Sequence, residues 1–136
     1  GISEEEIRPR VEQTLKICGL YPFRNWPVSA LSYGQKKRVT IASILVLNPE
    51  MVILDEPTAA MDMETTLLSE KLIVDYVKET GCSLILVTHS LQQARRIADE
   101  ALYFYKGTLE EIGPSESVLY TPKSEQTRRF LEFYGL

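Results

Sequence analysis

The order of apolar runs and helical stretches along this 136-residue chain predicts a doubly wound α/β layer. Two short apolar runs, 51–54 and 83–87, have the length and composition of strands that are buried on both faces of a parallel sheet. A stretch with helical character, 64–80, separates them, and Gly81 follows it as a stop signal. We therefore expect two parallel strands joined by a crossover helix.

Two further helices are predicted before the first strand. Residues 3–18 show amphipathic periodicity, and Ser3 with Glu6 three residues later matches a capping box at the N-terminus. The residues expected to form the apolar face of this helix are Ile7, Val11, Leu15 and Cys18. The proline-containing stretch 20–30 is expected to be a loop, after which Ser32 caps a helix that runs to about Leu47.

The C-terminal third is predicted to hold a hairpin among short helices. Lys106-Gly107 lies between two stretches of strand-like composition, which favours a two-residue hairpin turn. The elements expected in this third are a helix at 90–99, strands at 101–105 and 108–112, and helices at 115–120 and 123–134.

Composition excludes several classes of function. The net charge of −4 argues against a nonspecific nucleic-acid binder, and the one basic run, Lys36-Lys37-Arg38, is interpreted as a solvated helix face near a phosphate site. Cys18 and Cys82 are far apart and only one histidine is present, so we expect reduced thiols and no zinc site. Neither a membrane-spanning apolar stretch nor a signal peptide is evident, so a cytoplasmic location is expected, with any membrane association through a partner.

Asp55 and Glu56 directly follow the first apolar run. Ligands of parallel sheets bind beyond the carboxyl ends of the strands, where these two carboxylates are expected to lie. One carboxylate that holds Mg²⁺ and a neighbour that polarises a water are the groups that phosphoanhydride hydrolysis requires. The alternative is a strand that ends in a solvated turn.

His89 ends the second apolar run, on the same predicted edge of the sheet. A histidine there can donate a hydrogen bond to a terminal phosphate or hold a water in line. A lone histidine is more often structural, but its pairing with Asp55 and Glu56 on one edge favours the functional interpretation.

The segment Leu31-Ser32-Tyr33-Gly34-Gln35 begins a predicted helix. A serine hydroxyl and free backbone N–H groups at a helix N-terminus form an anion site, which the helix dipole strengthens. Gly34 is expected to let the backbone approach a phosphate closely. The alternative is an ordinary serine N-cap.

Taken together, these motifs resemble the second half of an ABC-transporter nucleotide-binding domain. The matching segments are the signature motif at 31–35 with Tyr33 where glycine is usual, the Walker B strand at 51–56, the D-loop at 59–62 and the switch histidine in Thr88-His89. The resemblance extends over essentially the whole chain and implies part of a P-loop NTPase fold, with a parallel sheet and flanking helices.

The resemblance also implies roles for individual residues. Asp55 would ligate Mg²⁺ through water, Glu56 would be the catalytic base and His89 would contact the γ-phosphate of ATP. Asp62 of the D-loop would link two active sites across a dimer. The signature residues, which would bind ATP held by the opposite subunit, are Ser32, Tyr33, Gly34 and Gln35.

No G-x-x-x-x-G-K-[ST] loop occurs in the chain, which begins at Gly1, so we expect a truncated ATPase that lacks its Walker A half. We expect 1–48 to be the remnant of a helical subdomain and 49–136 to be the C-terminal part of the ATPase core. Because turnover by this chain alone is doubtful, the alternative is a non-catalytic nucleotide-sensing or docking module that needs a separate Walker A-bearing chain.

The partners implied are the Walker A half, a second nucleotide-binding domain and transmembrane permease subunits at the inner face of the membrane. The motifs favour an importer, with the substrate left open. Unpaired strand edges predict that the chain alone is oligomeric, swapped or partly molten.

Overall fold

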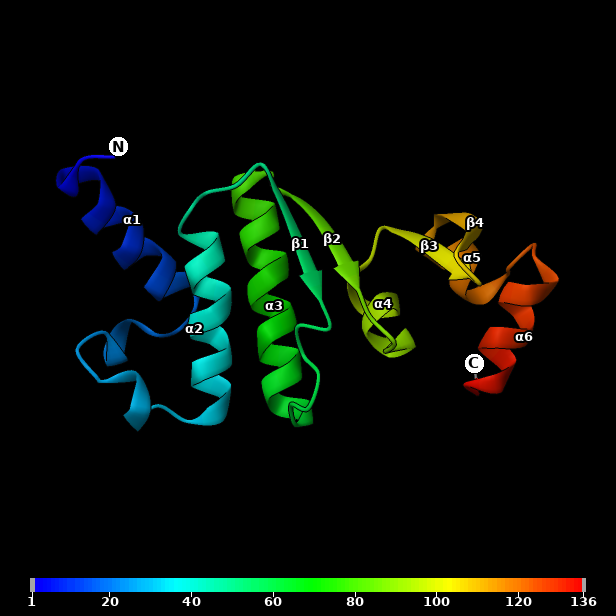
Figure 1. Cartoon of the computed structure of the whole chain (residues 1–136), viewed down its shortest axis with the longest axis horizontal. Coiled ribbons are helices and arrows are strands. Elements are labelled where there is room, and N and C mark those ends of the chain that lie inside the picture. The colour runs from blue at the N-terminus through cyan, green and yellow to red at the C-terminus, as the bar shows by residue number, and fades with distance from the viewer. Residues whose placement is uncertain (1, 136) are drawn as a thin grey trace. The chain divides into compact units, whose positions relative to one another are not determined.

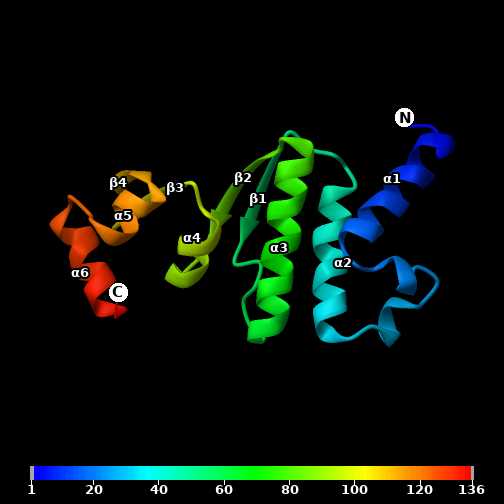
Figure 2. The same cartoon turned by 180° about the vertical axis from the view of Figure 1, so that it is seen from behind.

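The computed structural model describes residues 2–135, so Gly1 and Leu136 lie outside the described residues. The chain forms two compact units, the first ending at Val87 and the second beginning at Thr88 (Figures 1 and 2). Each unit is described by itself.

The first unit begins with helix α1, Glu4–Ile17. The carboxylate of Glu6 accepts a hydrogen bond from the backbone N–H of Ser3 at 3.3 Å, as the predicted capping box requires. The predicted apolar face is wrong for the first half of the helix, because Ile7 and Val11 remain exposed there. The described part of the unit packs only the last turns of α1 into the core.

The predicted loop contains two short 3-10 turns, Tyr21–Phe23 and Val28–Ala30. Helix α2 follows at Tyr33–Leu45, with Ser32 as its N-cap. The prediction of this helix is confirmed, and it ends two residues before the expected Leu47 because the chain turns toward Asn48, whose φ of 50° is left-handed.

Two parallel strands and their crossover helix complete the first unit. Strand β1, Met51–Asp55, pairs in parallel with β2, Ser83–Val87, and helix α3, Met63–Thr80, joins them. Gly81 ends α3 with a φ of 69°, a left-handed conformation in which glycine carries no Cβ penalty. The predicted parallel pair with its crossover helix is confirmed.

The core of this unit lies between α2, α3 and the inner face of the strands. Tyr76 of α3 is buried, and its hydroxyl donates to the backbone carbonyl of Leu45 at 3.1 Å, which satisfies a terminal carbonyl of α2. The buried side chains of this core are Cys18, Leu20, Ile41, Ala42, Leu45, Val52, Leu54, Leu72, Ile73, Tyr76 and Cys82.

The expectation that both strands are buried on two faces is wrong for the described structure. Val52 and Leu54 of β1 point into the core, but Met51 and Ile53 on the opposite face are 54% and 64% exposed. Ile85 and Val87 extend the same exposed face on β2. The physical reason is that α3 covers one face of the two-stranded sheet, and no element of the described first unit covers the other.

Another correction concerns the basic run. Lys36 is exposed, but the guanidinium of Arg38 donates to the backbone carbonyl of Cys18 at 3.1 Å, so Arg38 ties α2 to the end of α1 instead of being solvated. Cys18 and Cys82 are buried free thiols, as predicted. Burial raises the pKa of Cys18 to about 11, against an opposing effect of Arg38, which keeps this thiol protonated at neutral pH.

The second unit is a hairpin covered by short helices. Its elements are α4 at Leu91–Ile97, β3 at Glu100–Tyr105, β4 at Thr108–Pro114, α5 at Ser115–Tyr120 and α6 at Glu125–Phe133. Lys106 and Gly107 both have positive φ, as a two-residue type I′ turn requires, and the predicted antiparallel hairpin is confirmed. The ring of Phe130 in α6 lies 4.7 Å from that of Tyr103 in β3.

Among the helices of residues 2–135, none combines the length and the apolar character that a membrane crossing requires.

Candidate nucleotide-phosphate site

Two carboxylates lie where β1 ends. Asp55 is the last residue of the strand and pairs with Val87, and its side chain is exposed. Glu56 has a φ of 45°, and its backbone N–H donates to the carbonyl of Val87 at 2.9 Å. A left-handed φ on a residue with a side chain costs on the order of 1 kcal/mol and persists only where the surrounding structure imposes it. The chain therefore turns sharply at Glu56, with both carboxylates at the carboxyl edge of the sheet.

This edge fits a magnesium ion better than a closed metal site. Among residues 2–135, no three histidine, cysteine, aspartate or glutamate side chains lie close enough together to hold a metal. Mg²⁺ usually keeps several waters and is held by one or two carboxylates together with substrate phosphates. Asp55 is a ligand of the type that this mode of binding uses, and its role as the Mg²⁺ ligand stays a prediction.

His89 belongs to the second unit and follows the last residue of β2 by two positions. Its neighbours Thr88 and Ser90 form the start of α4, where the hydroxyl of Thr88 accepts from the N–H of Ser90 at 3.0 Å. Ser90 in turn caps α4 by accepting from the N–H of Gln93 at 3.2 Å. The side chain of His89 is exposed, and its meeting with Asp55 and Glu56 stays a prediction.

The signature turn, residues 32–35, begins α2. The hydroxyl of Ser32 accepts from the N–H of Gln35 at 3.2 Å, and the side-chain carbonyl of Gln35 accepts from the N–H of Ser32 at 2.8 Å. This reciprocal capping fixes the turn and leaves the N–H groups of Tyr33 and Gly34 without an intrahelical acceptor, as the first turn of any helix does. No carboxylate lies in this first turn.

The charges beside the signature turn are positive. Lys36 and Lys37 follow Gln35, and the ammonium of Lys37 lies 5.7 Å from the centre of the Tyr33 ring. Cations near a helix N-terminus are unfavourable because they meet the positive end of the helix dipole. The start of α2 thus combines a hydroxyl, free N–H groups and two ammonium groups, which together suit an anion.

Asp62, the D-loop residue, is the N-cap of α3. One carboxylate oxygen accepts from the N–H of Thr65 at 2.8 Å, and the other accepts from the Thr65 hydroxyl at 2.9 Å. The hydrogen bond from the Thr65 N–H, followed by that from its hydroxyl, lowers the pKa of Asp62, so this exposed carboxylate stays ionised at neutral pH.

The two turns are in contact. Helices α2 and α3 begin at the same end of the first unit, as both views show (Figures 1 and 2). A Cβ placed on Gly34 would lie 2.8 Å from the methyl carbon of Thr65. The structure therefore joins the signature turn to Asp62 through Thr65, a residue that the sequence analysis did not single out. Because Thr65 lies three residues after an aspartate N-cap, the sequence alone predicts its contact with Asp62.

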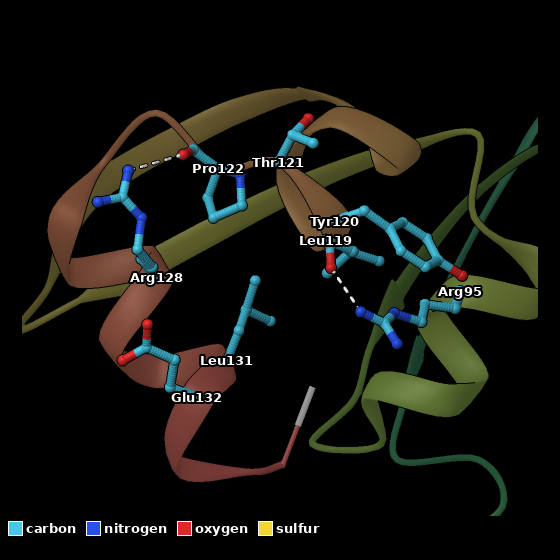
Figure 3. A pocket seen from close by; sticks show the side chains of 8 residues that line it. All are labelled: Arg95, Leu119, Tyr120, Thr121, Pro122, Arg128, Leu131 and Glu132. Atoms are coloured by element: carbon cyan, nitrogen blue, oxygen red, sulfur yellow. Dashed lines mark hydrogen bonds between the residues drawn. The ribbon is translucent and has the colours of Figure 1, made fainter.

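A separate pocket of about 540 Å³ lies among α4, α5 and α6 of the second unit (Figure 3). The guanidinium of Arg95 donates to the carbonyl of Leu119 at 2.7 Å and lies 3.9 Å from the centre of the Tyr120 ring. Arg128 points to the carbonyl of Pro122 at 3.5 Å. None of the predicted nucleotide residues lines this pocket, so it is not the predicted phosphate site.

Comparison with known proteins identifies the family of the chain and its fold. Residues 2–59, which include the signature turn, Asp55 and Glu56, match the family described as ABC transporter. The chain is 51% identical over 111 residues to an ABC transporter ATP-binding protein of Lactobacillus johnsonii, with 80% of this chain covered. It is 46% identical over 134 residues, 96% of this chain, to an ABC transporter ATP-binding protein of Bacillus thuringiensis.

This chain belongs to the ABC transporter ATP-binding family. It spans 19% of the length of the Lactobacillus relative and 23% of that of the Bacillus relative. The resemblance inferred from the motifs is thereby confirmed.

Solved structures of ABC transporter proteins show the same fold. CbiO1 from Clostridium perfringens, part of the ABC transporter complex CbiONQ, superimposes with a TM-score of 0.82 at 32% identity, covering 100% of this chain and 56% of CbiO1. The dimeric structure of MJ0796, a bacterial ABC transporter cassette, gives a TM-score of 0.68 at 33% identity, covering 85% of this chain and 50% of that one. The α/β architecture described above is thus part of the P-loop NTPase fold of ABC ATPases.

Proposed function

We propose that this chain is part of an ATP-hydrolysing subunit of an ABC transporter, and that its signature turn receives the γ-phosphate of ATP bound to a second cassette. The observation that carries the proposal is the electrostatic composition of the first two turns of α2, which follow a neutral serine cap and hold Lys36 and Lys37 but no carboxylate. Helices α1, α3, α5 and α6 instead carry an acidic residue in the first turn. The short helix α4 shares the serine cap and the lack of an acidic residue, but it has no basic residue in its first turn. A turn of this kind without a carboxylate is suited to an external anion.

The capping geometry supports a role of Ser32 in binding. Its hydroxyl oxygen accepts from the N–H of Gln35, which leaves the hydroxyl hydrogen available to donate to a phosphate oxygen. The N–H of Gly34 points out of the same turn and is a second donor for that phosphate. The exposed ring of Tyr33 lies at the rim of this site.

Hydrolysis requires the carboxylates at the end of β1. Glu56 would accept a proton from a water, the water oxygen would form a bond to the γ-phosphorus, and the bond to the β–γ bridging oxygen would break to release ADP. Asp55 would hold Mg²⁺ through water, and this ion when bound neutralises charge that develops on the phosphate oxygens. His89 would donate a hydrogen bond to the γ-phosphate.

Partners are needed for this activity. The phosphate-gripping loop would come from a Walker A-bearing half, and 1–48 and 49–136 would then be the helical subdomain remnant and part of the ATPase core. The exposed apolar face at Ile53 and Ile85 supports the proposal that a further segment covers the sheet. Permease subunits would hold the assembled cassettes at the inner face of the membrane.

The exposed sheet face and strand edges give a prediction for this chain by itself. We expect self-association or partial loss of tertiary packing in solution, because apolar side chains and unpaired strand edges remain open to other copies. Light scattering with NMR amide dispersion measures both. A stable monomer with sharp, dispersed amide signals would contradict the expectation.

The function itself is tested by ATP turnover of a longer protein in which this chain is joined to a Walker A-bearing half. Glu56→Gln is expected to reduce kcat by about 100-fold or more, while ATP binding is retained, because the general base is removed and the phosphate contacts are not. Glu79→Gln is the matched control, since Glu79 is an exposed carboxylate at the opposite end of α3. Unchanged turnover in Glu56→Gln would overturn the catalytic assignment, and ATP binding without turnover in the wild type would support a sensing module instead.

A further inference from the structure

Thr65 contacts two of the predicted site segments that lie in the first unit, Asp62 of the D-loop and Gly34 of the signature turn. Its hydroxyl and its backbone N–H each donate to the carboxylate of Asp62, at 2.9 and 2.8 Å. Its methyl group faces the backbone of Gly34, where an added Cβ would lie 2.8 Å from the methyl carbon. One half-buried side chain therefore has a polar contact to the D-loop and a steric contact to the signature turn.

We propose that Thr65 is a positioning residue that couples the D-loop to the signature turn, and that its methyl group is the reason why position 34 must be glycine. This inference rests on the proposed function, because it concerns how the phosphate-binding turn is held. It assigns no contact with ATP to Thr65 itself.

The backbone conformation of Gly34 does not by itself require glycine. This residue lies inside α2 and has an ordinary helical conformation, so no left-handed φ requires glycine. Glycine in a helix is less stable than alanine, so the local preference of the chain is for a side chain at this position. The close approach of Thr65 opposes that preference, because a Cβ at position 34 requires the Thr65 side chain to shift, and its hydroxyl bond to Asp62 holds that side chain in place.

The polar part concerns Asp62. The two hydrogen bonds from Thr65 fix the rotamer of the Asp62 carboxylate and hold the last residue of the D-loop on α3. The N–H bond belongs to the helix cap and would persist with any residue at 65, whereas the hydroxyl bond depends on serine or threonine. The pKa of Asp62 is lowered by both bonds, which supports the same geometry.

These two contacts have a joint consequence. A displacement of the D-loop that moves Thr65 also moves the group against which the signature turn packs, so the two turns respond as one unit. Misplacement of about 1 Å in a positioned group costs about 100-fold in rate. Coupling through Thr65 would therefore make the signature turn sensitive to the state of the D-loop.

A double-mutant cycle tests the steric contact. Gly34→Ala is expected to lower the turnover of the longer protein by about 100-fold. Thr65→Ser removes the methyl group but keeps the hydroxyl, so it is expected to change turnover by less than about threefold and to restore the double variant to within about tenfold of wild type. If Gly34→Ala is equally impaired with and without Thr65→Ser, the steric assignment is overturned.

A measurement of stability tests this inference independently of the proposed function. In a longer protein that also holds the Walker A half, Gly34→Ala is expected to lower the urea midpoint of unfolding, and Thr65→Ser is expected to restore it, whether or not the protein hydrolyses ATP. If glycine serves only close approach to phosphate, Gly34→Ala instead leaves the midpoint unchanged or raises it. That outcome would overturn the inference and leave the proposed function intact.

The polar contact has its own test. Thr65→Val keeps the size of the side chain and removes the hydroxyl, so the carboxylate of Asp62 is expected to titrate at a higher pH than in wild type, as followed by NMR. Thr65→Ser keeps the hydroxyl and is expected to leave that titration unchanged. Equal titration of Asp62 in the wild type and Thr65→Val would overturn the assigned role of the hydroxyl.

Discussion

Two helices begin side by side in the first unit, and their first turns differ in charge. Helix α3 starts with Asp62, whose carboxylate accepts from its own helix and neutralises the positive end of the dipole. Helix α2 starts with Ser32, a neutral cap, and continues into Lys36 and Lys37. The backbone geometry of the two starts is similar, since both caps have extended φ and ψ values.

Helix capping and anion binding are therefore separable functions of a helix start. Aspartate and serine stabilise a helix start about equally well, so stability alone does not choose between them. Only the serine leaves an uncompensated positive end and a hydroxyl hydrogen for an external acceptor. The comparison therefore supports the proposal that α2, and not α3, binds a phosphate.

The largest expected effect comes from giving α2 the cap that α3 has. Ser32→Asp is expected to reduce the ATP turnover of the longer protein by about 100- to 1,000-fold, because the new carboxylate repels the phosphate and the hydroxyl donor is lost. The urea midpoint of this chain should stay close to wild type, because aspartate is an equally good cap.

The matched control is the reciprocal change, Asp62→Ser, which keeps a capping oxygen on α3 and adds no negative charge to α2. Ser32→Thr is a second control, because it retains the hydroxyl. If Ser32→Asp turns over ATP at the wild-type rate, α2 does not bind the phosphate. The difference in charge between the starts of α2 and α3 is then unrelated to phosphate binding.

An effect of intermediate size is expected on the stability of the fold as the pH is lowered. Because Asp62 has a folded-state pKa below its ordinary value of 3.8, it contributes stability that is fully present above pH 3.8 and is lost as the pH falls through the lower folded value. Urea unfolding of this chain at a series of pH values between 6 and 2.5 measures this loss.

Asp62→Asn should remove the part of the acid dependence that belongs to α3, since an amide oxygen can still cap the helix but does not titrate. Glu111 is a second source of acid dependence. Burial raises the pKa of its carboxyl, but hydrogen bonds from the backbone N–H groups of Lys123 and Ser124 outweigh this effect, so the net pKa is lowered. An acid profile of Asp62→Asn that is identical to wild type would show that the ionised cap of α3 adds nothing to stability.

The smallest effect is expected from the lysines of α2. Lys36→Gln with Lys37→Gln removes two cations from the positive end of the helix, so each substitution is expected to stabilise this chain by ~0.3 kcal/mol. In the longer protein the same pair should raise KM for ATP by about twofold, with kcat nearly unchanged, and the difference should shrink at high salt. A loss of stability in this double variant would contradict the charge argument for α2.

The elements of the first unit were predictable because their signals are local. Ser32 before an apolar-periodic stretch, Gly81 after α3 and the two apolar runs at 51–54 and 83–87 each report a backbone preference of a few neighbouring residues. The structure confirms these helices and strands with shifts of one or two residues at their ends.

The packing was less predictable, because the spacing of apolar residues along one helix or strand does not show which other element packs against it. The apolar residues Ile7 and Ile53 were assigned to buried faces from their spacing and composition, and the structure leaves both exposed. Arg38 was assigned to a solvated face and is bonded to the end of α1. Burial depends on a second element that comes from elsewhere in the chain or from outside it.

The residues alone sufficed to predict the helix starts, the parallel pair with its crossover helix, and the family to which the chain belongs. These depend on short-range preferences and on the order of motifs, which the residues carry directly. The tertiary structure alone decided that Gly34 meets Thr65, since residues 31 positions apart approach each other only after α2 and α3 pack in parallel. It also decided which face of the strands is covered, because burial of apolar surface follows the arrangement of whole elements and not the composition of any one of them.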